Sequence, residues 1–365
     1  MQPKFNLDQY LTEGVETIVK DALAASLKNP NETAFLFTYA LAAKRAANTR
    51  ESHAAKGKHI PSFLIASITN RCNLHCAGCY ARANHICHDG TEDALLTDDE
   101  WNRIFTQAEQ IGVSFILLAG GEPMLRRGVI ERAAEHRDIL FPVFTNGTLL
   151  SDSMLRLLDE HRNLVPIVSI EGNPEQTDAR RGEGTYAKLT QHMAQMRDAG
   201  ILFGASVTLT TENFPVVTGD AFLQSLRSFG AKVVFFVDYV PADPGTEALA
   251  PGDAEREALA NRLDQLRTKQ DGTIYVSFPG DEQYSDGCLA AGRGFFHISP
   301  SGGAEPCPFS PVSDTNLRQV SLLDALDSPL FQRLRASSLL ELHHTGACAL
   351  FGRDDELAAL CGTNA

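Results

Sequence analysis

The sequence has few basic residues and no long hydrophobic run. Its 365 residues include 32 Lys and Arg against 46 Asp and Glu, a net charge of −14. Nucleic acids and anionic membranes bind basic surfaces, so we expect neither as a partner. No stretch of about 18 consecutive apolar residues occurs, so no membrane-spanning helix is expected. The first residues, Met1–Leu7, do not contain the apolar segment that is typical of a signal peptide. We therefore expect a cytoplasmic protein.

Cysteine is uncommon, and its placement is uneven. Without an export signal, the eight cysteines are expected to be metal ligands or free thiols rather than disulfides. Cys72, Cys76 and Cys79 form a C-x3-C-x2-C motif. Three thiolates can hold three irons of a four-iron cluster and leave the fourth open, whereas a ferredoxin closes all four with cysteine. Zinc is the alternative, although it usually takes four ligands from C-x2-C pairs or histidines.

Between residues 62 and 242, short apolar runs alternate with amphipathic helical patterns. The runs are rich in Val, Ile, Leu and Phe, which is typical of strands buried on both faces of a parallel sheet. They are residues 63–69, 113–120, 140–146, 165–171, 201–209 and 232–240. Six strands with intervening helices predict an α/β fold, a partial (β/α)6 TIM-like barrel with its functional loops at the carboxyl ends of the strands.

The remaining segments flank this predicted barrel. Residues 1–60 show helical spacing and are expected to be an N-terminal helical segment, with capping of the barrel favoured over a substrate-recruiting role. After Pro241, prolines and glycines mark a break. We expect residues 61–242 to form the core and residues 243–365 a small C-terminal α+β domain.

Polar residues follow four successive predicted strands, where they would meet at the barrel mouth. The second strand ends in Gly120-Gly121-Glu122-Pro123, in which the glycines allow close backbone approach. The later strand ends carry Asn146, Ser169 and Glu171. Four such ends are difficult to explain by structure alone. At the sixth strand, Asp238 and Tyr239 are candidate catalytic groups, with a purely structural role as the alternative.

Together these motifs resemble the radical S-adenosylmethionine (SAM) enzymes. The resemblance covers about residues 62 to 242 and rests on the cysteine loop with Tyr80, Gly120–Pro123, Thr145–Gly147, Ser169–Gly172, Arg180–Tyr186 and Val207–Asn213. It implies a [4Fe–4S] cluster on Cys72, Cys76 and Cys79, SAM on the open iron, and hydrogen abstraction by a 5′-deoxyadenosyl radical.

The same resemblance suggests roles for individual residues. It implies cofactor binding by Tyr80, Gly120, Gly121, Glu122, Asn146, Ser169, Glu171 and Arg181. The Gly120–Glu122 turn would receive the methionine ammonium group, Ser169 and Glu171 would lie near the ribose or carboxylate, and Arg181 near the carboxylate.

Four further cysteines lie in the C-terminal part: Cys288, Cys307, Cys348 and Cys361. Their setting resembles the SPASM or twitch extension, which implies an auxiliary [4Fe–4S] cluster. Full SPASM domains have more cysteines and a C-x2-C run, so we expect only one such cluster. Cys361 is either its fourth ligand or a spare thiol, and structural zinc is the alternative for the whole site. Cys87 fits no pattern and is expected to be a free thiol.

The expected partners follow from this chemistry. A one-electron donor of the flavodoxin or ferredoxin type would reduce the cluster, and the substrate would be a peptide or a small molecule. The N-terminal segment does not resemble a leader-peptide-binding module, which tilts against leader-dependent substrates. The competing class is an iron–sulfur electron carrier or a zinc-stabilised binding protein, neither of which needs the polar strand ends.

Overall fold

The computed structural model describes residues 30–84, 86–90, 94–269, 271–284, 287–340 and 348–362. One nine-stranded sheet in the order β7-β6-β5-β4-β3-β2-β1-β8-β9 organises the fold. All neighbouring strands pair in parallel except β8 and β9. The strands are β1 (Phe63–Thr69), β2 (Phe115–Gly120), β3 (Phe141–Thr145), β4 (Leu164–Ser169), β5 (Gly204–Leu209), β6 (Val233–Asp238), β7 (Ile274–Phe278), β8 (His297–Ile298) and β9 (Ala304–Glu305).

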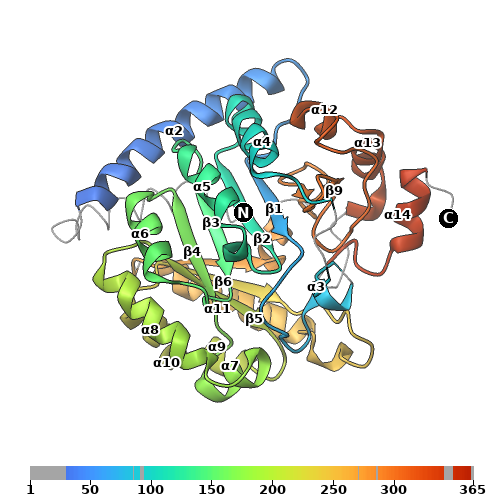
Figure 1. Cartoon of the computed structure of the whole chain (residues 1–365). Helices are drawn as coiled ribbons and strands as arrows, with labels where there is room; N and C mark the ends of the chain where they lie inside the picture. Colours follow the sequence, from blue (N-terminus) through green and yellow to red (C-terminus); the bar gives the residue numbers. More distant parts are fainter. Residues whose placement is uncertain are drawn as a thin grey trace.

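Helices connect the parallel strands and lie around the outside of the sheet (Figure 1). The α-helices of the described residues are α2 (Pro30–Ala54), α3 (Tyr80–Ala83), α4 (Asp98–Ile111), α5 (Arg127–Glu135), α6 (Asp152–Glu160), α7 (Pro174–Arg181), α8 (Thr185–Asp198), α9 (Phe214–Val217), α10 (Asp220–Phe229), α11 (Asp253–Thr268), α12 (Leu322–Leu326), α13 (Pro329–Ala336) and α14 (Asp354–Cys361). Short 3-10 turns are η1 (Pro123–Leu125), η2 (Glu247–Leu249), η3 (Gly280–Tyr284) and η4 (Ser338–Leu340).

Local sequence signals account for several of these helices. Thr97 and Glu100 form a capping box at the start of α4, and Gly112 ends that helix in a left-handed conformation. The apolar stripe of α4, from Trp101 to Ile111, is buried in the hydrophobic core. The α/β barrel-like fold expected from the sequence is therefore confirmed.

The sheet extends beyond the six predicted strands. β7 lies after residue 242 but pairs in parallel with β6, with α11 as the crossover helix. On the opposite edge, β8 pairs with β1, so the C-terminal part of the chain contributes strands to both edges. The boundary expected at residue 242 thus does not coincide with the edge of the sheet.

The interior of the barrel is not filled by side chains. Alternate residues of β2 and β6 remain partly exposed although these strands are central. Phe63, Phe115, Phe235 and Val276 border a cavity at the carboxyl ends of the strands and also a second cavity of about 430 Å³ at their amino ends. The apolar side chains that line the lumen are therefore available to a ligand.

Helix α2 covers the amino-terminal end of this lumen. Leu36 and Tyr39 line the second cavity, and the Tyr39 hydroxyl donates to the Ser114 carbonyl at 2.9 Å. Arg162, which is buried, donates to Glu32 of α2 at 2.8 Å and to the Gly200 carbonyl. Residues 1–29 of the predicted N-terminal helical segment lie outside the described residues. No helix among those described is long and apolar enough to cross a membrane.

Replacing Arg162 with Met should leave the Glu32 carboxylate without its ion-pair partner and weaken the attachment of α2 to the barrel. Breaking a buried ion pair on one side costs about 3–5 kcal/mol, which thermal and urea unfolding would register. The matched control is Arg45→Met, because Arg45 of the same helix pairs with Asp138 at 2.7 Å in an exposed setting. Exposed pairs contribute about 1 kcal/mol or less. Equal losses in the two variants would contradict a special anchoring role for Arg162.

Candidate functional site

The three core cysteines lie in the loop that follows β1 at the carboxyl edge of the sheet. Two backbone hydrogen bonds join this loop to the end of β2: Gly121 N–H donates to the Thr69 carbonyl at 2.9 Å, and Glu122 N–H to the Arg71 carbonyl at 2.8 Å. On its far side, Ala77 N–H donates to the Arg180 carbonyl at 2.9 Å. The loop is therefore held between β2 and the end of α7.

The two glycines are required by this contact between backbone segments. A Cβ atom on Gly120 would lie 2.3 Å from the Thr69 carbonyl oxygen, and one on Gly121 would lie 2.0 Å from the Arg71 carbonyl oxygen. Neither oxygen can move aside, because both belong to the backbone. The sequence suggested close approach to a ligand, but in the structure the close approach is to the cysteine loop. Both glycines also line the cavity at the barrel mouth.

Glu122 ties the end of β2 to the end of β3. Its carboxylate is fully buried and accepts hydrogen bonds from Met124 N–H, the Thr145 hydroxyl and Asn146 N–H at 3.0, 2.7 and 2.7 Å. Burial raises the pKa of this carboxyl group, and the three donors oppose that shift. The Glu122 side chain thus holds the turn in place through these hydrogen bonds. A direct contact between its carboxylate and an ammonium group stays a prediction.

Two side chains from outside the loop, one after β3 and one at the end of α7, reach the cysteine thiols. Asn146 Nδ2 lies 3.9 Å from Cys72 Sγ and donates to Asn73 Oδ1 at 2.9 Å. Arg181 Nη1 lies 4.0 Å from Cys76 Sγ. Burial raises the pKa of Cys76, and the positive charge of Arg181 is the largest opposing influence. Arg181 therefore offsets part of the cost that burial imposes on the thiolate form, which is the form that binds iron.

Glu171 orients Arg181. Its carboxylate is almost fully buried. One carboxylate oxygen accepts from Nε and Nη2 of Arg181, and the other accepts from Thr208 N–H at 3.0 Å. Arg180 lies 3.5 Å from the same carboxylate and stacks over the Tyr239 ring at 5.8 Å. Ser169 and Arg181 line the cavity, whereas the Glu171 carboxylate is occupied by these partners.

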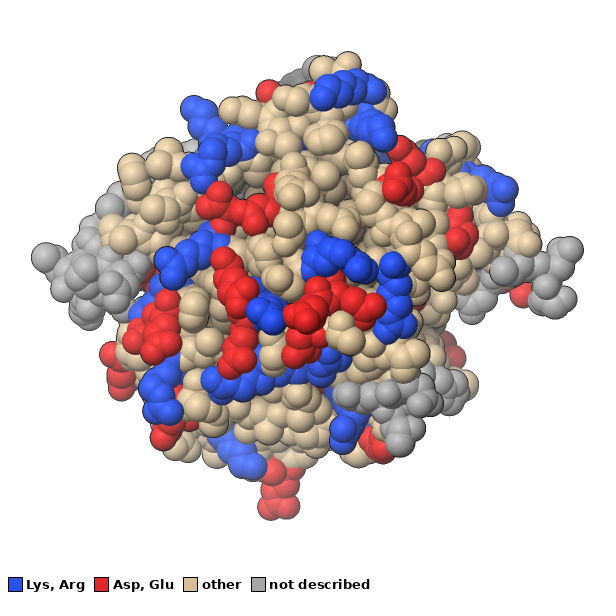
Figure 2. Space-filling view, turned by 45° about the horizontal axis from the view of Figure 1, so that its top comes forward, with Lys and Arg blue, Asp and Glu red and all other residues tan. Residues whose placement is uncertain are grey.

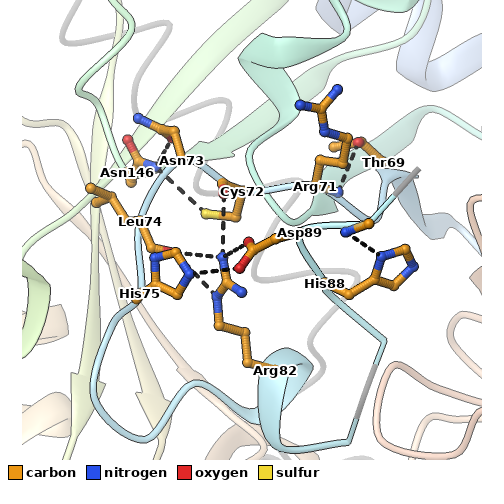
Figure 3. Close-up of polar contacts among 11 residues, drawn as sticks. Thr69, Arg71, Cys72, Asn73, Leu74, His75, Arg82, His88, Asp89 and Asn146 are labelled. Carbon is orange, nitrogen blue, oxygen red and sulfur yellow. Dashed lines mark hydrogen bonds and ion pairs between the residues drawn. The ribbon is translucent and has the colours of Figure 1, made fainter. Parts of the chain in front are cut away.

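Arg82 supports the cysteine loop, although no sequence motif predicted this role. As Figure 3 shows, its guanidinium lies inside the loop, where it donates to the Leu74 carbonyl at 3.0 Å and the Cys72 carbonyl at 3.3 Å. Asp89 accepts from both Arg82 and His75, at 3.0 and 2.9 Å. A single arginine beside a cysteine motif carries no spacing signal, so only the folded loop reveals that Arg82 supports it.

A cavity of about 310 Å³ opens beside the three cysteines. Its walls combine polar groups from the strand ends with aromatic and aliphatic side chains of the lumen. Besides Cys72, Cys76 and Cys79, it is lined by Tyr80, Asn146, Ser169, Arg181, Asp238, Tyr239, Glu282 and Phe309, among others. The Tyr80 and Phe309 rings contact each other at 4.7 Å between centroids and thus join the core to the C-terminal part.

Asp238 and Tyr239 differ in what they contribute. The Tyr239 ring lies against Gly78, where an added Cβ would come within 2.6 Å of the hydroxyl oxygen, so Tyr239 supports the cysteine loop. Asp238 is buried and pairs with Arg256 at 3.0 Å through Oδ2, while Oδ1 has no hydrogen-bond partner. Burial raises the pKa of Asp238. Both residues line the cavity.

Three of the four C-terminal cysteines come together. Cys307, Cys348 and Cys288 lie close enough to one another for their thiols to influence each other's ionisation. The proximity of Cys348 and burial raise the pKa of Cys307, whereas the pKa of Cys348 is lowered to about 7. Cys361 is the last residue of α14, and its place as a fourth ligand stays a prediction.

The arrangement of thiols fits iron–sulfur clusters. All eight cysteines are free, and the three of the core loop face the cavity. Within the described ranges, no three His, Cys, Asp or Glu side chains converge as ligands of a single metal ion must. A cluster instead distributes its ligands over several irons. Cys87 is buried, and burial raises its pKa to about 11, which is typical of an inert thiol.

Comparison with known proteins gives consistent matches. Residues 66–228 match the family model of the Radical SAM superfamily. The chain is 28% identical to the AdoMet-dependent heme synthase of Methanosarcina barkeri over 75% of its length and 85% of the relative's. It is 25% identical to the PqqA peptide cyclase of Rhizobium meliloti, over 82% and 78%. The fold is similar to SAM-bound SuiB of Streptococcus suis, with a TM-score of 0.64 and 18% identity over 76% and 68% of the two chains.

Replacing Gly121 with Ala should displace the cysteine loop and reduce the iron bound after anaerobic reconstitution to less than half. The reason is the 2.0 Å approach of the new Cβ to the Arg71 carbonyl oxygen. Gly252→Ala is the control, because a Cβ there meets only the flexible end of Glu255 at 3.1 Å. Iron and sulfide analysis, with circular dichroism to verify folding, measures the effect. Undiminished iron in Gly121→Ala would refute the packing argument.

Proposed function

Because the chain belongs to the radical SAM superfamily through residues 66–228, we propose that Cys72, Cys76 and Cys79 hold its SAM-binding [4Fe–4S] cluster. The chain is an enzyme, and its cofactors are SAM and iron–sulfur centres. When bound, they supply a 5′-deoxyadenosyl radical by reductive cleavage of SAM, which removes hydrogen from a substrate. The observation that carries the proposal is the presence of three thiols, from one loop held by β2 and α7, beside a cavity.

The surrounding residues would position SAM in that cavity. We propose that the Gly120–Glu122 turn receives the methionine ammonium group, with Glu122 bracing the turn through its three hydrogen bonds. Arg181, oriented by Glu171, would attract the methionine carboxylate. Ser169 and Asn146 line the cavity and could donate or accept hydrogen bonds. Tyr80 would close one wall together with Phe309.

We propose a peptide side chain of neutral, largely apolar character as the substrate. The walls of the lumen are aromatic and aliphatic, including Phe144 and Phe235. Of the charged groups that line the cavity, Arg180 and Arg181 are paired with Glu171. Asp238 is paired with Arg256, and Asp281 with Arg267. The buried carboxyl group of Glu282 and the apolar walls suit a neutral side chain better than a polycarboxylate. The similarity to relatives named PqqA peptide cyclase agrees with a peptide.

A tetrapyrrole is the second candidate substrate. Its support is the similarity to the relative named AdoMet-dependent heme synthase, which spans 303 aligned residues at 28% identity. The apolar walls described above favour the peptide over a molecule that carries several carboxylates.

We further propose that residues 243–365 form an auxiliary domain that binds a second [4Fe–4S] cluster through Cys288, Cys307 and Cys348. The proximity of these thiols supports this role. A flavodoxin or ferredoxin would supply the electron in the cytoplasm. On the face shown in Figure 2, acidic and basic side chains are interspersed rather than gathered into one basic surface. An electron carrier or zinc-stabilised binding protein would have no use for the cavity beside the thiols.

The enzyme should release 5′-deoxyadenosine from SAM under anaerobic conditions with dithionite, and Cys76→Ala should reduce this release at least 100-fold. Loss of one ligand leaves the cluster incomplete, whereas Cys87→Ala, which removes a buried thiol outside the motif, should retain the activity. Chromatography of the nucleoside measures the outcome. Equal release by the wild type and Cys76→Ala would contradict the proposal.

The same assay distinguishes the two substrate classes. A peptide substrate deuterated on its side chain should transfer deuterium to 5′-deoxyadenosine, detected by mass spectrometry. A tetrapyrrole should produce no saturable change in its own absorption when titrated with the protein. Saturable tetrapyrrole binding with deuterium transfer from that molecule would overturn the peptide assignment and leave the cluster assignment intact.

A further inference from the structure

We infer that the cavity at the amino ends of the strands is a second ligand site, which takes a small amphiphile with one anionic head and an aliphatic body. This amino-end cavity, of about 430 Å³, lies between α2 and the beginnings of the strands, at the opposite end of the barrel from the cysteine loop. Sites for small molecules typically have volumes of about 300–1,000 Å³. The site does not depend on the radical chemistry proposed for the other end of the barrel.

The walls of the amino-end cavity are mainly aliphatic and aromatic. The beginnings of β1 to β4, β6 and β7 supply most of them, including Val165, Ile167, Val233 and Ile274. Protein interiors are close-packed and leave few spaces of this size. An apolar space that does remain binds apolar molecules rather than ordered water. The walls therefore suit the aliphatic body of a ligand.

Helix α2 covers the amino-end cavity without filling it. Besides Leu36 and Tyr39, the helix presents three small side chains to the cavity, which are Ala40, Ala43 and Ala47. Two larger apolar side chains of the same helix, Phe37 and Leu41, are 58% and 48% exposed on its outer face. A helix whose only role is to close a barrel would turn such residues inward. The orientation of α2 therefore preserves the space beneath it.

The charged residues that line the amino-end cavity are both basic. They are Lys44 and Arg50 of α2, and within the described residues no Asp or Glu lines the cavity. This contrasts with the whole chain, in which 46 acidic residues outnumber 32 basic ones. Arg50 is held in place because its Nη1 donates to the Gly112 carbonyl at 2.6 Å, and its guanidinium keeps its charge. An anionic head would therefore be attracted to the side of the cavity that α2 forms.

A shared wall separates the amino-end cavity from the cavity beside the cysteines. Phe63, Phe115, Phe235 and Val276 line both cavities. The Phe63 and Phe115 rings contact each other edge to face, with 6.2 Å between centroids. Phe235 contacts the ring of Phe144, which lines the cavity beside the cysteines, at 5.1 Å. A ligand in the amino-end cavity would thus touch the floor of the substrate cavity without entering it.

Calorimetric titration of the reconstituted full-length protein with decanoate tests the site. We expect saturable binding with one site per chain. Ala43→Trp places an indole ring in the cavity and should weaken binding about tenfold or more, because the space is then occupied. The matched control is Ala54→Trp at the exposed end of α2, which should leave binding unchanged.

A second pair of variants tests the charge of the head group. Lys44→Glu should weaken decanoate binding about fivefold, because an attractive charge becomes a repulsive one at a partly screened site. The same variant should bind decanol, which has no charge, as well as the wild type does. Lys56→Glu, which makes the same change of net charge just beyond α2, should alter the binding of neither compound.

The outcomes separate this site from the radical chemistry. Absence of saturable decanoate binding to the wild type would overturn the inference. Undiminished binding to Ala43→Trp would also overturn it, since the ligand would then lie elsewhere. Equal weakening of decanoate and decanol binding in Lys44→Glu would contradict the anionic head. None of these titrations requires SAM cleavage, so a failure of the proposed reaction would leave their results unaffected.

Discussion

The contact between the end of β2 and the loop after β1 determines where the core thiols lie. Gly121 approaches the Arg71 carbonyl so closely that no side chain fits between them, and two backbone hydrogen bonds close the contact. Because backbone atoms make this contact, its geometry does not depend on flexible side chains. The residues that follow, from Cys72 to Cys79, begin from a fixed point at the carboxyl edge of the sheet. The cavity and the residues around it are arranged around that point.

Buried charges extend this constraint to the other strands. Glu122 connects β2 to β3, and Glu171 connects the end of β4 to β5 and to Arg181. A buried carboxylate is costly unless its hydrogen bonds are satisfied, and each of these has at least three donors or ion-pair partners. The strand ends are thereby linked into one unit that carries the thiols, the guanidinium of Arg181 and the cavity wall. Such a linked unit would fix the position of a cofactor before it binds, which favours catalysis.

The sequence was sufficient to predict the parts of the fold that depend on local patterns. The apolar runs predicted β1 to β6, which the structure places in one sheet. The sequence did not predict that β7 belongs to the sheet. The strand pairs with β6, but α11 and the break at Pro241 separate the two strands in the sequence. The close contact of Gly120 with Thr69 and of Gly121 with Arg71 was not predicted, since only the folded chain shows which backbone they approach. Arg82 carries no motif, and its support of the cysteine loop arises from contacts that only the folded loop shows.

The central claim is that one iron of the core cluster has no protein ligand and accepts SAM. Mössbauer spectroscopy of ⁵⁷Fe-reconstituted protein with Cys288, Cys307 and Cys348 replaced by Ala isolates the core cluster and tests this claim most directly. Addition of SAM should change the isomer shift of one iron in four and leave the other three unaffected. Four irons that do not respond to SAM, or a single mononuclear metal ion, would contradict the account.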